Sequence, residues 1–115
     1  MLLTKIFEFD ASHLLSEKIG GKNHGRLHGH RYKLEVTVKG DLNEDGIIMD
    51  ASKIKKLVKE LILEDLDHNH INEFIENPTV ENIAKFIWKK LKPSLENLHE
   101  IKLWETPTIN ATYRE

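Results

Sequence analysis

The stretch HGHRYKLEVTVKG, residues 28–40, decides the fold of this chain. From Arg31 onward polar and apolar residues alternate strictly, until Gly40 ends the run. Because successive side chains of a β-strand point to opposite faces, this pattern predicts a strand with one buried face. His28 and His30 precede the apolar residues of that strand and lie on the same face.

Three more strands are expected outside this stretch. Residues 2–9 form the first of them, with apolar residues on one face. Residues 99–105 and 108–114 form the other two, around the turn at Pro107.

Two helices are expected between the second and third strands. Apolar residues at helical spacing follow Asp50, a predicted N-cap, and a second such stripe follows Pro78 and Thr79. The order strand, strand, helix, helix, strand, strand predicts an α+β fold. In this fold both helices cover one face of a four-stranded antiparallel sheet.

Size and composition narrow the class of protein. The chain of 115 residues suits one domain, and its formal net charge of -2, without a basic run interleaved with aromatics, argues against nucleic acid as a direct partner. No apolar run approaches the roughly 20 residues that span a bilayer, so we expect no membrane partner and a cytoplasmic protein. Cysteine is absent, so a bound metal would be held by His, Asp or Glu.

Three histidines end two of the apolar stripes. His28 and His30 share the face of Tyr32, and His13 shares the face of Phe9 in the first strand. Imidazoles on a buried face are costly unless each nitrogen finds a hydrogen bond or a metal. One metal ion would satisfy all three together, so we interpret them as a metal site. The alternative is three separate histidines in the core or near loops.

Two other motifs carry carboxylates. In EIKLWETP, residues 100–107, Glu105 continues the inward face of the strand; it either meets a donor there or turns to water. In LDHNHIN, residues 66–72, Asp67 stands next to His68 and offers a carboxylate that orients an imidazole. The alternative is that both are simply solvated at a helix end.

The chain resembles the 6-pyruvoyl-tetrahydropterin synthase and 6-carboxy-tetrahydropterin synthase family over nearly its whole length. Five motifs stand in the family's order: FDASH, LHGH, LDHNHIN, PTVENIA and ETPTINATY. The resemblance implies that residues 1–115 are one T-fold domain. It also implies that subunits join through their sheets into a barrel, usually as a homo-hexamer of two trimers. An open sheet with two free edges independently predicts that the chain is not a monomer.

The resemblance also assigns roles to residues. It implies the substrate 7,8-dihydroneopterin triphosphate, whose side-chain hydroxyls reach a zinc ion. Glu105, with Thr106 beside it, would anchor the pterin ring, and Asp67 with His68 would relay protons. The zinc ligands would be His13, His28 and His30.

One position departs from the family pattern. The pattern has a cysteine, three residues and then H-G-H, whereas HGRLHGH, residues 24–30, has His24 where that cysteine, the usual general base, would stand. A histidine can also take up a proton, so His24 is the candidate base. Family members with another residue here include some that cleave the side chain of the substrate to a 6-hydroxymethyl pterin.

Three functions follow from this comparison. The preferred one is a zinc-dependent lyase that yields a 6-carboxy- or 6-pyruvoyl-tetrahydropterin for pterin synthesis or for modified nucleosides such as queuosine or archaeosine. The second is side-chain cleavage to a 6-hydroxymethyl pterin for folate-type synthesis. The third is a pterin- or metal-binding protein without turnover.

Overall fold

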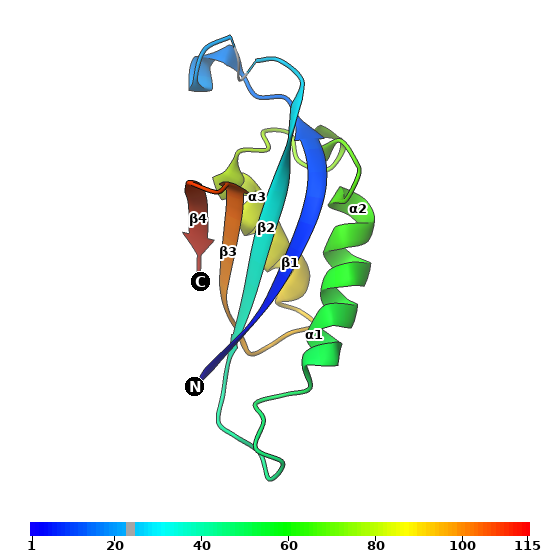
Figure 1. Ribbon diagram of the computed structural model, residues 1–115, viewed down its shortest axis with the longest axis vertical. Helices are drawn as coiled ribbons and strands as arrows, with labels where there is room; N and C mark the ends of the chain where they lie inside the picture. The colour runs from blue at the N-terminus through cyan, green and yellow to red at the C-terminus, as the bar shows by residue number, and fades with distance from the viewer. Residues whose placement is uncertain (23–24) are drawn as a thin grey trace.

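The computed structural model describes residues 1–22 and 25–115. Four antiparallel strands form one sheet in the order β1-β2-β3-β4, so each strand pairs with its neighbours in the sequence (Figure 1). The strands are β1 Leu2–His13, β2 His28–Lys39, β3 Leu98–Thr106 and β4 Ile109–Tyr113. The predicted four-stranded sheet is confirmed. β1 continues past the predicted end at residue 9 because its last residues pair with the histidine-bearing start of β2.

Two long helices lie on one face of the sheet (Figure 1), as predicted. The first consists of α1 Ala51–Val58, a π-helical turn η2 Lys59–Leu63 and α2 Glu64–Leu66 in direct succession. The second is α3 Val80–Leu91. Both predicted N-caps are confirmed: the Asp50 carboxylate accepts from the N–H of Ser52, and the Thr79 hydroxyl accepts from the N–H of Asn82.

Short helical turns complete the elements. η1 Glu17–Ile19 follows β1, and η3 Ile71–Glu73 precedes α3. None of the helices in the described ranges is long and apolar enough to cross a membrane.

The core fills the space between the helices and the inward face of the sheet. One row of apolar side chains crosses all four strands through Phe7, Leu34, Leu103 and Ala111. Full burial of a side chain such as Leu34 contributes about 1.5–3 kcal/mol to the free energy of unfolding. A slip of β2 by one residue would turn its apolar residues to water, so the alternation read from the sequence fixes the register.

The opposite face of the sheet carries mainly polar side chains, with Leu2 and Ile6 of β1 exposed among them. Arg31 of β2 donates to Asp10 of β1 at 2.9 Å, and the indole N–H of Trp104 in β3 donates to Glu35 in β2 at 2.6 Å. These side chains satisfy one another across the strands. The face can therefore remain hydrated, and the sheet edges are the part of the fold that most needs a partner.

The sheet is uneven at the end that carries the histidines. β2 pairs with β1 as far as His28 opposite His13, but it pairs with β3 only from Lys33 opposite Trp104. The pairing of β3 with β4 shifts register around Glu105, which makes that residue part of a β-bulge. The start of β2 is therefore open on the side of β3.

Candidate metal centre and adjoining cavities

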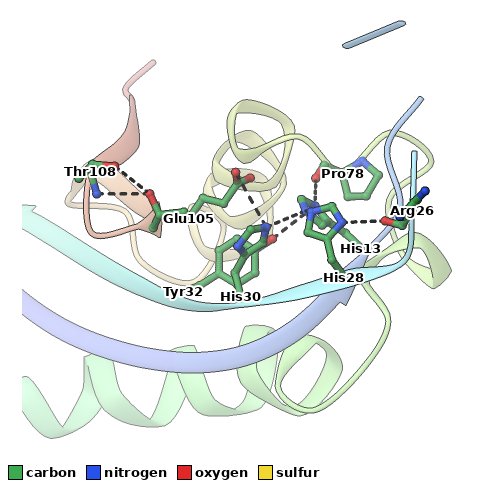
Figure 2. A network of polar contacts seen from close by, with 9 residues as sticks. His13, Arg26, His28, His30, Tyr32, Pro78, Glu105 and Thr108 are labelled. Carbon is green, nitrogen blue, oxygen red and sulfur yellow. Dashed lines mark hydrogen bonds and ion pairs between the residues drawn. The ribbon is translucent and has the colours of Figure 1, made fainter. Parts of the chain in front are cut away.

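Three imidazoles meet at this end of the sheet (Figure 2). His13 comes from the end of β1, and His28 and His30 come from the start of β2. The Nε2 atom of His13 lies 2.9 Å from that of His28 and 3.1 Å from that of His30. Their ligand atoms all lie within 4.8 Å of one another, and these three residues form the one group of His, Cys, Asp or Glu in the described part of the chain that could hold a metal ion.

Hydrogen bonds from the chain orient two of the three rings. His13 donates from Nδ1 to the carbonyl oxygen of Pro78 at 2.9 Å, and His28 donates from Nδ1 to the carbonyl oxygen of Arg26 at 2.7 Å (Figure 2). A carbonyl oxygen only accepts, so Nδ1 carries the proton in both neutral rings and each Nε2 presents a lone pair. In neutral rings, two lone pairs that face each other at 2.9 Å repel, and a metal ion or a proton between them would remove this repulsion.

This set of donors fits a zinc ion. Zinc holds imidazole nitrogens at about 2.0–2.1 Å, which in a tetrahedral arrangement separates them by about 3.3 Å. The separations of 2.9 and 3.1 Å need only a small expansion to reach that value. Three protein ligands leave a fourth position for substrate, as in catalytic zinc sites and unlike structural ones.

Tyr32 packs beneath the histidines from β2. Its ring is fully buried, stacks on Phe9 with centroids 5.0 Å apart, and stands perpendicular to His13. Its hydroxyl lies 3.4 Å from Nδ1 of His13. Burial, together with the nearby charge of Glu105, raises the pKa of the Tyr32 phenol, so the phenol stays neutral. Tyr32 thus holds the His13 ring in place through neutral contacts.

The β-bulge brings Glu105 to the edge of the metal centre. A carboxylate oxygen of Glu105 lies 4.0 Å from Nε2 of His30, and both side chains are 18% exposed. Glu105 and Thr106 line an open cavity of about 550 Å³ that also reaches His30. The Thr106 hydroxyl accepts from the N–H of Thr108 at 3.3 Å and closes the turn into β4. Both predicted substrate-binding residues therefore adjoin the histidines.

Asp67 and His68 lie beside β1. The carboxylate of Asp67 is 2.9 Å from Nδ1 of His68, which is the orienting contact that the sequence suggested. The main chain of Asp10 holds both residues, because its N–H donates to Asp67 at 3.0 Å and its carbonyl accepts from the N–H of His68 at 2.6 Å. His68 has a φ of 60°, and its side chain is 78% exposed. Its imidazole is thus presented to solvent and to ligands.

The segment after His68 continues along β1. The Ser12 N–H donates to the carbonyl of Asn69, and the Ser12 hydroxyl lies 3.0 Å from Nδ1 of His70. Further along, the Asn72 side chain bonds the N–H and the carbonyl of Leu14, both at 2.9 Å. The last part of β1 is therefore covered along its outer edge.

Sequence reasoning missed the groups that orient the metal-facing rings. The carbonyls of Pro78 and Arg26 belong to the backbone, and side-chain chemistry gives no signal for them. The one available hint was Tyr32, which follows the histidines on the same face. The predicted base His24 lies outside the described residues, which stop at Lys22 and resume at Gly25.

Comparisons with known proteins agree with this arrangement. Over 129 positions the chain is 34% identical to a 6-pyruvoyl tetrahydrobiopterin synthase of Dictyostelium discoideum, covering 99% of this chain and 96% of that protein. It is also 34% identical over 140 positions to a 6-carboxy-5,6,7,8-tetrahydropterin synthase of Haemophilus influenzae, covering 98% of each. With a dihydroneopterin monophosphate aldolase of Pyrococcus furiosus the identity is 40% over 100 positions, covering 84% of this chain and 82% of the other.

A solved structure and a family model extend the likeness to the fold. The 6-pyruvoyl tetrahydropterin synthase of Caenorhabditis elegans superposes with a TM-score of 0.90 at 27% identity, covering 100% of this chain and 95% of that one. The family model described as 6-pyruvoyl tetrahydropterin synthase matches residues 2–115. The four-stranded sheet with two helices is therefore a T-fold, and the chain belongs to the 6-pyruvoyl tetrahydropterin synthase family of enzymes.

Proposed function

We propose that this protein is a zinc-dependent lyase that acts on the side chain of a phosphorylated 7,8-dihydroneopterin. The observation that carries the proposal is the meeting of His13, His28 and His30, two of them with opposed lone pairs, beside the carboxylate of Glu105. This arrangement puts a site for a cation next to an acceptor for ring N–H groups. Three relatives with pterin-related names support the substrate class.

The histidines and Glu105 would bind the substrate together. A zinc ion held by the three imidazoles would leave a position for a substrate hydroxyl and lower the pKa of that hydroxyl. Glu105 would accept hydrogen bonds from the amino group and the adjacent N–H of the pterin ring, with Thr106 beside it. Hydrogen bonds to a carboxylate are stronger than those between neutral groups, so Glu105 would decide how the ring lies.

Asp67, His68 and His24 would move protons. The Asp67 carboxylate fixes the Nδ1–H tautomer of His68, which directs the other ring nitrogen of His68 outward for proton exchange. His24 stands four residues before the HGH motif, and we assign it the role of the base that takes a proton from the substrate.

Side-chain cleavage to a 6-hydroxymethyl pterin suits this chain better than formation of a carboxy or pyruvoyl product. The chain has no cysteine, so no thiol can serve as the base. The identity to the Pyrococcus furiosus aldolase is 40%, against 34% to each of the two synthases.

The cleavage is a retro-aldol reaction with a simple proton balance. The base takes the proton of the hydroxyl on the second side-chain carbon, and the bond between that carbon and the first carbon, which is attached to the ring, breaks. The second carbon leaves as the aldehyde of a phosphorylated two-carbon fragment. The electron pair passes toward the ring, and an acid returns a proton to the carbon that remains on it. His24 would be the base, and His68 would be the acid.

The working enzyme would be an oligomer closed through its sheet edges. The segment that follows His68 covers the end of β1, which leaves residues 2–8 as a free edge among the described residues. β4 is the edge strand on the other side of the sheet. Pairing between the β4 of one subunit and the open half of β1 in the next would extend the sheet into a barrel, in keeping with a hexamer of two trimers.

Product analysis tests the proposal directly. The zinc-loaded protein is incubated separately with 7,8-dihydroneopterin triphosphate and with the monophosphate, and the products are identified by mass spectrometry. A 6-hydroxymethyl pterin is expected. A 6-carboxy- or 6-pyruvoyl-tetrahydropterin would support the alternative product of the same site. Tight pterin binding without any product would contradict the proposed lyase and support a binding protein.

A further inference from the structure

Two open cavities meet over the start of β2. The first is the cavity of about 550 Å³ lined by Glu105 and Thr106; the second, of about 560 Å³, is lined by His68 and His70. Both are bounded by the same stretch of β2, residues 29–31. Gly29 contributes no side chain there, and a Cβ atom added to it would lie 3.2 Å from the carbonyl oxygen of Ala11. This close approach of β1 favours glycine at position 29. The cavity at Glu105 is also lined by Arg31, whose side chain lies on the outer face, because the start of β2 is unpaired on the side of β3.

Arg31 is the cationic side chain that both cavities share. Its Nε and one Nη donate to the two carboxylate oxygens of Asp10 at 2.9 and 3.2 Å. A guanidinium carries five N–H donors, so three remain for a ligand. The side chain is 69% exposed, and Asp10 holds it in one orientation. The Asp10 carboxylate accepts these hydrogen bonds and raises the pKa of Arg31, so the positive charge persists.

We propose that Arg31 binds the phosphate of the substrate and makes the enzyme prefer phosphorylated over unphosphorylated neopterin. This inference rests on the proposed function. The ring would lie at Glu105, the side chain would pass His30, and the phosphate would reach the remaining donors of Arg31. The relative named as a monophosphate aldolase gives the ligand class.

The chemistry of Arg31 fits this task better than that of the neighbouring Lys33. The Lys33 ammonium lies 4.6 Å from the ring centroid of Trp104, and Glu8 is its partner across β1 and β2. A guanidinium presents paired donors to two phosphate oxygens, whereas an ammonium acts as a point charge. The hydrogen bonds to Asp10 restrict the conformation of the Arg31 side chain before a phosphate binds, so little conformational entropy is lost on binding.

The test compares two ligands on three variants. Dissociation constants of neopterin and neopterin monophosphate are measured by pterin fluorescence on zinc-loaded wild type, Arg31→Gln and Arg31→Lys. Because Arg31→Gln removes charged hydrogen bonds, the dissociation constant of the monophosphate should rise roughly ten- to a hundredfold in this variant. The dissociation constant of neopterin should change less than about twofold. Arg31→Lys should recover part of the loss.

Arg114→Gln is the matched control. Arg114 is also exposed and also paired with a carboxylate, that of Glu100, but it lines neither cavity. This variant should bind both ligands like wild type. Equal affinity of wild type for the two ligands, or equal losses for both in Arg31→Gln, would overturn the role of Arg31 while leaving the pterin site in place. Failure of wild type to bind either ligand would instead overturn the proposed function, and the role of Arg31 with it.

Discussion

His13 is the residue where the contacts of the metal centre converge. Its side chain is completely buried, its Nε2 faces two other imidazoles, and its Nδ1 meets the carbonyl of Pro78 and the hydroxyl of Tyr32. Each contact fixes a different aspect of the ring: the tautomer, the tilt and the direction of the lone pair. A ring held in this way is prepared for a cation before one binds, so little of the binding free energy is lost in ordering it.

Replacing any one of the three imidazoles should remove the metal. We expect His13→Ala, His28→Ala and His30→Ala each to lose stoichiometric zinc after dialysis, measured by elemental analysis. Two remaining ligands make a poor zinc site, since such sites in proteins need at least three. His70→Ala is the control, because His70 bonds Ser12 beside β1 and should leave the zinc content unchanged. Full zinc in all three variants would refute the assignment.

Glu105 should control pterin affinity without holding the metal. Each hydrogen bond to a carboxylate contributes about 1.5–3 kcal/mol, so Glu105→Ala should weaken pterin binding more than tenfold in a fluorescence titration. Its zinc content should stay at the wild-type level. Glu100→Ala in the same strand removes a carboxylate that pairs with Arg114 and should bind pterin normally. Unchanged affinity in Glu105→Ala would mean that this side chain simply turns to water.

His24 should matter for turnover and not for zinc. A positioned base typically contributes about 10²–10⁴-fold, so His24→Ala should lose turnover in that range while its zinc content stays intact. His24→Cys restores the family pattern and should shift products toward the carboxy- or pyruvoyl-pterin. Steady-state rates and product masses check both variants. Loss of zinc in His24→Ala would make His24 a ligand, and indifference to both changes would remove it from the mechanism.

At the scale of elements, the start of α3 connects stability to the metal centre. The Thr79 hydroxyl caps α3 by accepting from the N–H of Asn82 at 3.2 Å, and the residue before it, Pro78, supplies the carbonyl that receives Nδ1–H of His13. The helix cap therefore also positions an acceptor behind His13, a candidate metal ligand. In β3, the bulge has a similar effect, because it directs Glu105 toward His30.

Removing this cap should affect both stability and metal affinity. Thr79→Ala should lower the free energy of unfolding by about 0.5–2 kcal/mol in urea denaturation of the metal-free protein, because an N–H of the first turn loses its acceptor. Zinc affinity, measured by competition with a chelator, should also fall. Asp50→Ala is the matched control, since it removes the cap of α1, which lies away from the histidines. If both variants bind zinc equally well, Pro78 is not positioned by the cap.

At the scale of the whole molecule, shape and surface polarity point to assembly through edges. The chain is elongated, 54 Å by 23 Å by 23 Å, with β1 and β4 at opposite sides of the sheet (Figure 1). Ion pairs and hydrogen bonds among the side chains of the outer sheet face pair polar groups there, so this face depends less on a partner chain to cover it. The covered end of β1 would limit pairing with another chain to the first half of this strand.

Light scattering should therefore report a mass well above that of one chain. The single chain has a mass of 13.4 kDa, and a multiple of it is expected at micromolar concentration. Unpaired strand edges expose rows of N–H and carbonyl groups that another copy can satisfy, so the association should persist at high salt. A mass of one chain under these conditions would contradict the barrel.

The sequence by itself determined the sheet, the helices and the shared face of the histidines that the structure brings together. Alternation in residues 31–39, helical spacing after Asp50 and Thr79, and the shared face of His28 and His30 are local patterns. Each is set by backbone geometry over a few residues, with a period of two in strands and 3.6 in helices. Local patterns of this kind can be read from the sequence without knowledge of the tertiary contacts.

Only the tertiary structure decided how these residues work together. The carbonyl that fixes the tautomer of His13 comes from Pro78, 65 residues further along the chain, and the bond that holds Asp67 comes from Asp10, 57 residues before it. The bulge that turns Glu105 arises from a mismatch between two strands, which neither strand encodes alone. Such contacts depend on how separate elements pack, because the atoms that meet are backbone groups with the same chemistry at every position.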